Sequence, residues 1–319
     1  MFISKKTLDD LLQAVFERVL KDGAHISATK GANTELTGVS LELQNPRARL
    51  SRTETKGTVF SCFGEALWYL AGSRDLNFIE YYLPGYDEFS DDGKTVYGAY
   101  GPRLINKDDS IPQISNVVRL LKQKRTTRQA VIQLFDARDI IGKHADIPCT
   151  CALQFLIRRN KLHMFTFMRS NDAFRGLPHD IFSFTFLQEI VARMVGADLG
   201  RYWHAASSLH LYDQDKSKVQ GYLKEGWQAT NMPMPEMPAG DPWPHITKLL
   251  DAESHIRSKE AVRIEDLHLP DYWSDLATLL QIYASDDKGI RRLKAQMHSN
   301  IYDTYIEKRA QAKEKNQNE

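Results

Sequence analysis

Cysteine is scarce in this chain, and its scarcity limits what can hold the fold together. Only three of the 319 residues are cysteine, which is too few for a disulfide framework and typical of a reducing compartment. Cys149-x-Cys151 is the one close pair, and no second pair completes a zinc-binding pattern. We therefore expect neither disulfides nor a metal site.

An excess of charge of one sign and long apolar runs are also missing. Lys and Arg number 42 against 41 Asp and Glu, so the chain lacks the basic surplus of a protein that binds nucleic-acid polymers. No apolar run approaches the roughly 18 residues of a membrane span, and residues 1–6 lack the apolar core of a signal peptide. We expect a soluble, cytoplasmic protein without a membrane partner, in which local groups bind any anion.

Hydrophobic periodicity predicts a mixture of helices and strands. The predicted helices cover 7–22, 58–72, 112–124, 181–195 and 288–315, and the predicted strands cover 37–44, 130–135, 151–158, 162–168 and 201–212. Gly23 is the expected left-handed terminator of the first helix. The short gap between 151–158 and 162–168 predicts an antiparallel hairpin. This mixture indicates an α+β fold with a large sheet buried on at least one face.

Residues able to do chemistry concentrate between positions 147 and 212, at the ends of apolar segments. This stretch holds a possible nucleophile, Cys149, the pair Arg169-Ser170, a carboxylate after a Gly-Leu-Pro turn, Asp180, and the pair His210-x-Tyr212. Ends of regular elements are where a rigid scaffold presents functional side chains. We expect these residues to form one site.

Two further features allow a functional or an ordinary interpretation. Glu65 lies among apolar residues of the predicted helix 58–72, where burial raises the pKa of a carboxyl towards the acid–base range; alternatively it points outwards. The arginines at 47, 49 and 52 either clamp a phosphate through bidentate bonds or belong to a solvated loop.

Eight short motifs, taken together in order and spacing, resemble the thymidylate synthase family. The resemblance runs with gaps from about residue 7 to about 225. The motifs are Gly64-Glu65-x-Leu67-Trp68-Tyr69-Leu70, Asp87-Glu88, Val96-Tyr97-Gly98, Pro148-Cys149, Gln154-Phe155, Arg169-Ser170-x-Asp172, Gly176-Leu177-Pro178 and His210-Leu211-Tyr212.

The resemblance implies a fold and a domain organisation. It implies a thymidylate synthase-like α+β fold, in which a large mixed or antiparallel sheet packs with long helices and one sheet face forms a homodimer interface. Residues 1–225 would be the catalytic domain. Residues 226–319 would be a divergent extension that packs on the same domain and ends in a helix.

The resemblance also implies catalytic and cofactor-binding roles. Cys149 would be the thiolate that attacks C6 of a pyrimidine nucleotide, Glu65 would manage water and protons around the ring, and Tyr97 would assist proton removal from C5. The cofactor would be 5,10-methylenetetrahydrofolate, with its pterin on Asp172. Tyr86 and Phe89 stand where the synthases carry two tryptophans that line the folate site.

Phosphate and sugar contacts carry over less completely. Arg169 and Ser170 would bind the phosphate together with Arg128 from a neighbouring subunit, and His210 and Tyr212 would bind the sugar hydroxyl. Gln129 follows Arg128 where the family pattern has a second arginine. The replacements considered for that missing cation are Arg125, Arg47 and Arg49, whereas Lys30 is near the N-terminal phosphate position but not aligned with it.

Asp180 is the departure with the clearest chemical meaning. The synthases place an asparagine here, whose amide pairs with O4 and N3–H of uracil. A carboxyl group accepts a hydrogen bond from N4 of cytosine and shares one proton with N3, and a mismatched polar edge costs orders of magnitude in discrimination. Asp180 also resembles the deoxycytidylate and cytidylate hydroxymethylase branch of the family.

The sequence therefore predicts folate-dependent hydroxymethylation of C5 of CMP or dCMP. Thr150 after the nucleophile, His179 beside Asp180, and the altered folate wall favour water over hydride in the last step. Two alternatives remain at this stage: a thymidylate synthase that methylates dUMP, and a pseudoenzyme that binds nucleotides or a partner chain. The choice between ribose and deoxyribose stays open.

Overall fold

A mixed seven-stranded sheet forms the centre of the molecule. The computed structural model describes residues 1–28, 30–229 and 232–318, with side chains described up to residue 315. The strands lie in the order β1-β3-β7-β6-β5-β4, and β2 pairs with β3. Their bounds are β1 Phe2–Lys5, β2 Ala24–Ala28, β3 Gly31–Leu43, β4 Val131–Gln133, β5 Thr150–Arg158, β6 Lys161–Asp172 and β7 Asp198–Tyr212.

Two strand pairs run parallel and the others antiparallel. β6 and β7 are parallel, as are β1 and β3, whereas β5 and β6 form the expected antiparallel hairpin. The mixed α+β architecture predicted from the sequence is thereby confirmed.

Eleven α-helices are assigned in the described residues. They are α1 Leu8–Asp22, α2 Val59–Leu70, α3 Leu76–Tyr82, α4 Tyr100–Ile105, α5 Gln113–Gln123, α6 Gly176–Met194, α7 Lys216–Glu225, α8 Trp243–Arg257, α9 Asp271–Ala284, α10 Asp287–Lys294 and α11 Asp303–Asn318. No helix in the described part of the chain combines the length and apolar character that crossing a bilayer requires.

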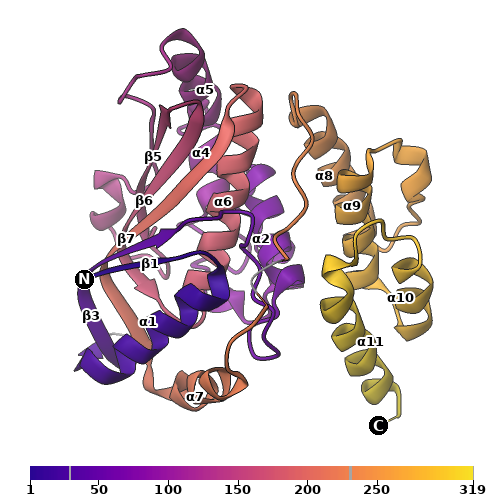
Figure 1. Cartoon of the computed structure of the whole chain (residues 1–319), viewed down its shortest axis with the longest axis horizontal. Helices are drawn as coiled ribbons and strands as arrows, with labels where there is room; N and C mark the ends of the chain where they lie inside the picture. Colours follow the sequence, from indigo (N-terminus) through magenta and orange to yellow (C-terminus); the bar gives the residue numbers. More distant parts are fainter. Residues whose placement is uncertain (29, 230–231, 319) are drawn as a thin grey trace.

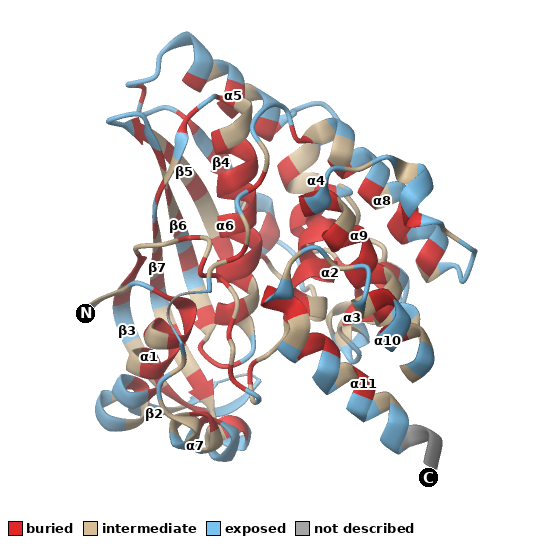
Figure 2. Ribbon diagram, turned by 45° about the vertical axis from the view of Figure 1, so that its right-hand side comes forward, coloured by how far each residue is buried: buried red, intermediate tan, exposed pale blue. Residues whose placement is uncertain are grey.

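The helices gather on one face of the sheet (Figure 1). α6 is almost completely buried between the sheet and α2. Its apolar residues occupy all sides of the helix, as expected for a helix that contacts other elements on both faces. From Lys161 to Met168 the side chains of β6 alternate, with Leu162, Met164 and Met168 buried towards α6. This alternation places Phe165, which is partly buried, and the exposed Phe167 on the opposite face, on which Figure 2 shows no covering helix.

The structure corrects two predictions about helix ends. Gly23 has φ −72° and is extended, not left-handed; glycine is needed there because a Cβ would lie 2.5 Å from Thr34 Cγ2 and from the Val19 carbonyl oxygen. The predicted helix 288–315 is two helices, α10 and α11. The break occurs where Asp275 accepts hydrogen bonds from the backbone N–H groups of His298 and Ser299, which diverts the chain.

The C-terminal residues pack on the same body as the sheet (Figure 1). Arg49 and Glu189, both fully buried, form an ion pair, and Glu189 accepts a hydrogen bond from Met237 N–H at 3.0 Å. Tyr305 in α11 donates to the Ser51 carbonyl at 2.7 Å, and Tyr283 in α9 donates to the Tyr81 carbonyl at 2.8 Å. The sequence signal after Tyr212 was too weak to predict α7, α8 and α9.

Candidate active site

The candidate site lies where β6 and β7 end side by side and α6 begins. The parallel register of these strands pairs Ser170 with Ser208 and Asp172 with His210. The hairpin partner β5 begins at Thr150, opposite Met168. Residues predicted from different motifs thus come together at one edge of the sheet.

Cys149 sits just before β5 and is linked to β6 through its backbone. Its carbonyl accepts a hydrogen bond from Arg169 N–H at 2.9 Å, and the Arg169 guanidinium donates to the carbonyls of Pro148 and Ile147 at 3.0 and 2.8 Å. Burial raises the pKa of the Cys149 thiol to about 11, while the positive charge of Arg169 opposes the rise. Arg169 is therefore the nearby cation that favours the thiolate.

Glu65 points into the protein rather than out of it. It is 7% exposed on α2, and Tyr69 O–H donates to its Oε1 at 2.8 Å. Its Oε2 has no hydrogen-bond partner among the described residues. Burial raises the pKa of Glu65 to about 7, which suits a group that takes and returns protons near neutral pH.

Asp180 is buried in the first turns of α6, where the charge of Glu65 acts on it. Its Oδ2 accepts a hydrogen bond from Asn171 Nδ2 at 2.7 Å. Burial, followed by the negative charge of Glu65, raises the pKa of Asp180 well above its usual range. The raised pKa favours the protonated form of Asp180, which has one proton to donate and oxygen lone pairs to accept.

The residues predicted for phosphate, sugar and pterin lie on neighbouring strand ends. Ser170 Oγ is 3.4 Å from His210 Nδ1. Asp172 uses Oδ1 to accept hydrogen bonds from Phe174 N–H and Arg175 N–H at 2.7 and 2.9 Å. Tyr212 belongs to the same cluster, because the charge of Asp172 contributes to its raised pKa after burial itself.

An aromatic wall borders this cluster. Tyr86 and Phe89 lie on one 3-10 turn with their ring centroids 5.0 Å apart, and Tyr86 packs edge-on against Trp68 at 5.7 Å. Lys30 places Nζ 4.1 Å above the Phe89 ring, and its charge reaches Cys149. Lys30, which the sequence did not align with any family position, is thus a cation of the site.

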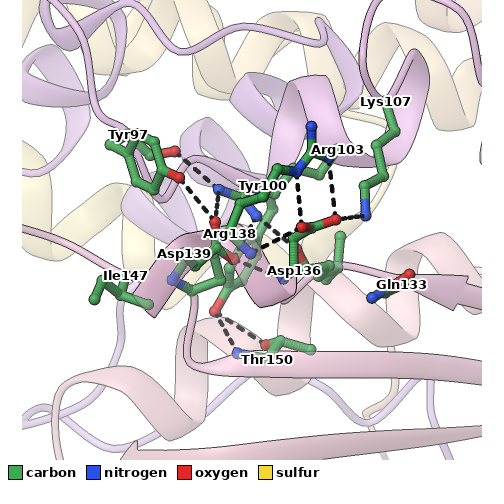
Figure 3. Close-up of polar contacts among 12 residues, drawn as sticks. Tyr97, Tyr100, Arg103, Lys107, Gln133, Asp136, Arg138, Asp139, Ile147 and Thr150 are labelled. Atoms are coloured by element: carbon green, nitrogen blue, oxygen red, sulfur yellow. Dashed lines mark hydrogen bonds and ion pairs between the residues drawn. The ribbon is translucent and has the colours of Figure 1, made fainter. Parts of the chain in front are cut away.

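Tyr97 and Tyr100 occupy different surroundings (Figure 3). Tyr97 donates to Asp139 at 3.1 Å, and Asp139 also pairs with Arg103 at 2.8 Å. Tyr100, in contrast, accepts hydrogen bonds from both N–H and Oγ1–H of Thr150 at 3.0 Å. The structure therefore brings Tyr100, rather than Tyr97, next to the residue that follows Cys149.

The sequence offered little reason to single out Tyr100 or the buried partners of Asp180. The one sequence signal for Asn171 was its place at the variable position of the Arg-Ser-x-Asp motif. His204 lay in a strand of alternating burial. Their importance follows from contacts between β6, β7 and α6 that periodicity does not predict.

The three cations proposed to replace the missing arginine have other partners. Arg49 is fully buried against Glu189, Arg125 donates to the Val195 carbonyl at 2.9 Å and to Asn160, and Arg47 lies 3.9 Å from Glu236. Burial in an ion pair contradicts the prediction for Arg49, whereas Arg125 and Arg47 stay predictions. Arg128 is exposed near the middle of β5, where its carbonyl accepts a hydrogen bond from Gln154.

The site, with a cysteine near buried carboxyl groups, and the family that matches the chain together support a one-carbon transferase that acts on a pyrimidine nucleotide. The family model described as thymidylate synthase matches residues 11–284. The chain belongs to the thymidylate synthase family. The match continues past the boundary expected at residue 225 and includes α8 and α9.

Three relatives are named as deoxyuridylate hydroxymethyltransferases. The protein of Delftia phage PhiW-14 is 28% identical over 261 residues, which cover 77% of this chain and 71% of the relative. That of Bacillus phage SP01 is 30% identical over 220 residues, covering 64% and 57%. That of Pseudomonas phage M6 is 33% identical over 160 residues, covering 49% and 45%. This chain therefore spans less than two thirds of the length of two of these relatives.

Proposed function

We propose that this protein hydroxymethylates C5 of a cytidine monophosphate, CMP or dCMP, using 5,10-methylenetetrahydrofolate and water. The observation that carries the proposal is the buried carboxyl of Asp180, whose pKa burial raises, at the position that the family resemblance assigns to the base. Its hydroxyl donates to N3 of cytosine while its other oxygen accepts from the N4 amine. Both polar atoms of the cytosine edge are then paired, as a buried site requires.

In this reaction Cys149 forms and later releases a covalent bond to the base. The thiol loses its proton under the influence of Arg169, and the sulfur attacks C6, so that C5 gains the electron pair of the double bond. C5 would then bond to the one-carbon unit. Loss of the C5 proton, together with cleavage of the bond between that unit and the folate nitrogen, would release tetrahydrofolate and leave an exocyclic methylene group on C5. Water adds its oxygen to that methylene and gives up a proton, and the C6–S bond breaks as the C5–C6 double bond returns.

Glu65 is the group suited to the proton transfers. Its pKa of about 7 allows both protonation states near neutral pH, and its free Oε2 can hold and deprotonate a water molecule. Tyr100 offers a second group, since Thr150 fills two acceptor positions of its hydroxyl and leaves the Tyr100 proton for the substrate.

The residues present fit the folate. Asp172 keeps its Oδ2 outside the two backbone bonds made by Oδ1, and Tyr86 with Phe89 offers an aromatic surface to a planar ring. When bound, the folate supplies an electrophilic carbon at the oxidation level of formaldehyde. His179 lines the approach with its ring fixed by Ser61 and the Arg175 carbonyl, each at 3.0 Å, and a polar ring there favours access of water.

The same proposal includes a homodimer formed through the uncovered sheet face. Phe165 and Trp203 stack there with centroids 4.5 Å apart, next to the 43% exposed Phe167. Apolar surface of this kind on a sheet is typical of an interface. A partner subunit would bring its Arg128 to the phosphate held by Arg169 and Ser170, as the family resemblance implies.

The second candidate is hydroxymethylation of dUMP, which the names of the three phage relatives favour. A neutral Asp180 also pairs with uracil if its donor and acceptor exchange places, because uracil presents O4 and N3–H in the reverse order. The two candidates therefore use the same residues. They differ only in the order in which the Asp180 carboxyl presents its hydrogen-bond donor and acceptor to the base.

Release of tritium from C5 separates these candidates. Purified protein is incubated with tetrahydrofolate and with C5-tritiated CMP, dCMP or dUMP, and the tritium in water is counted. We expect release from a cytidine nucleotide and none from the Cys149→Ser variant; with methylenetetrahydrofolate the product should be the 5-hydroxymethyl nucleotide. Release from dUMP alone would refute the cytidylate proposal, and release from none would favour a binding protein without activity.

A further inference from the structure

A line of buried polar side chains runs from Asp180 into the sheet. Asn171 Nδ2 donates to Asp180 Oδ2 at 2.7 Å, and Asn171 Oδ1 lies 3.0 Å from His204 Nε2. His204 Nδ1 lies 3.0 Å from the Tyr202 hydroxyl. These four residues are at most 8% exposed, so each bond is sheltered from competition with water.

Each member of this line fixes the next. Since Asn171 Oδ1 is an acceptor, His204 Nε2 carries the hydrogen, and Nδ1 accepts from Tyr202 O–H. Burial lowers the pKa of His204 to about 3, so the ring stays neutral with a single N–H. Gly176 leaves room for the Asn171–Asp180 hydrogen bond, because a Cβ at this position would lie 3.0 Å from Asn171 Nδ2 and 3.5 Å from Asp180 Oδ2.

This arrangement decides which oxygen of Asp180 carries its proton. Oδ2 faces the N–H of Asn171 and must be an acceptor, so the hydrogen of the neutral acid belongs on Oδ1. A free aspartic acid can place its proton on either oxygen and present donor and acceptor to the base in either order. Cytosine and uracil differ in that order alone at N3 and the 4-position.

We propose that Asn171, held by His204 and Tyr202, is a positioning residue for base specificity. It fixes the order in which the Asp180 carboxyl presents donor and acceptor to the pyrimidine. This inference rests on the proposed function for its direction, since it assigns Oδ1–H to N3 of cytosine and Oδ2 to the N4 amine.

The test compares kcat/KM for dCMP and for dUMP in three variants, measured by tritium release. Asn171→Leu removes the amide with little change in volume, and Tyr202→Phe removes only the hydroxyl that orients His204. Thr185→Val is the matched control: Thr185 is fully buried on α6 and bonds only to carbonyls of its own helix. A thermal melt of each variant verifies folding.

We expect Asn171→Leu to raise the ratio of dUMP to dCMP kcat/KM at least tenfold, and Tyr202→Phe to raise it by a smaller factor. Thr185→Val should leave the ratio unchanged. Loss of a purely structural contact would lower both values together and keep their ratio. A folded Asn171→Leu protein with the wild-type ratio would overturn the inference; if that variant does not fold, an unchanged ratio in Tyr202→Phe would do the same.

Failure of the proposed function is distinguishable from failure of the inference. If the wild-type protein prefers dUMP, the proposed substrate is wrong, but fixing of the order by Asn171 then predicts the opposite change. Asn171→Leu would in that case gain activity on dCMP at least tenfold relative to dUMP. An unchanged ratio refutes the role of Asn171 whichever base the wild type takes.

Discussion

Replacing Glu65 by glutamine should stabilise the protein in a pH-dependent way while abolishing its activity. Glu65 is buried, and burial raises the pKa of its carboxyl from 4.5 to about 7. A carboxyl whose folded pKa is raised favours the folded state while protonated. Its cost appears as the pH rises above 4.5 and is complete once the pH passes 7.

The size of the effect follows from the two pKa values. At pH 8 the unfolded carboxyl ionises freely while the folded one resists, which costs about 3 kcal/mol. At pH 5 the same calculation leaves under about 1 kcal/mol. A glutamine side chain does not ionise and has no such cost at either pH, so the stability gained by Glu65→Gln should be about 2.5 kcal/mol larger at pH 8 than at pH 5.

Comparison between two pH values removes effects that do not titrate. The glutamine keeps a carbonyl oxygen for Tyr69 O–H but places an amide where Oε2 had no partner in the described structure. That fixed cost, about 1–3 kcal/mol for an unpaired buried group, is the same at both pH values. Only the ionisation of Glu65, with its effect on the pKa of Asp180, changes between them.

Thermal melts at pH 5 and pH 8 measure the difference. For a chain of this size the expected gain at pH 8 over that at pH 5 is about 4 °C in Tm. Glu17→Gln, on the exposed face of α1, is the control and should shift Tm equally at both pH values. An equal shift for Glu65→Gln would mean that the carboxyl is already ionised at no cost, which would refute its acid–base role.

Further predictions concern the nucleophile, the tyrosines and the dimer. The rate at which iodoacetamide alkylates Cys149, followed by peptide mapping, should rise about tenfold per pH unit from pH 7 to pH 10, because the pKa of its thiol is about 11. A rate that reaches a plateau below pH 9 would contradict this. Tyr100→Phe should lower kcat for tritium release at least tenfold. Tyr97→Phe should lower Tm, because its hydrogen bond to Asp139 is lost, and should leave kcat within about twofold. The reverse result would restore Tyr97 as the catalytic tyrosine. Arg128→Ala should raise the nucleotide KM about tenfold at unchanged kcat, while the exposed Arg119→Ala on α5 should not; equal effects of the two would argue against a phosphate contact across a dimer.

The regular elements were largely predictable because each has one strong periodic signal. α1, α2, α5 and α6 and the β5–β6 hairpin lie close to their predicted ranges, since amphipathic spacing reflects a buried face directly. The C-terminal helices were not predictable to the same extent. Their positions depend on contacts with distant partners, such as Tyr82 O–H with Glu253 at 3.0 Å.

Site residues could be proposed from the sequence where chemistry demands a particular side chain in a motif, and their roles stay predictions. Cys149, Glu65, Asp172 and Asp180 have distinct requirements that a resemblance can carry. Cations were harder, because an arginine serves equally well in a buried ion pair, as Arg49 does with Glu189, or at a phosphate. Composition and spacing do not distinguish these uses.

The meaning of Asp180 illustrates the limit of interpreting one residue alone. As an ionised group it would only accept hydrogen bonds, and uracil O4 would be excluded outright. Burial and the charge of Glu65 raise its pKa and favour the protonated form, and a protonated acid accommodates either base unless something fixes its proton. In our proposal Asn171 supplies that restriction from β6, so base choice depends on a pair of residues and on the buried imidazole of His204 behind them. An asparagine or aspartate at position 180 is thus insufficient to assign the substrate of a relative, and the residue at position 171 has to be considered with it.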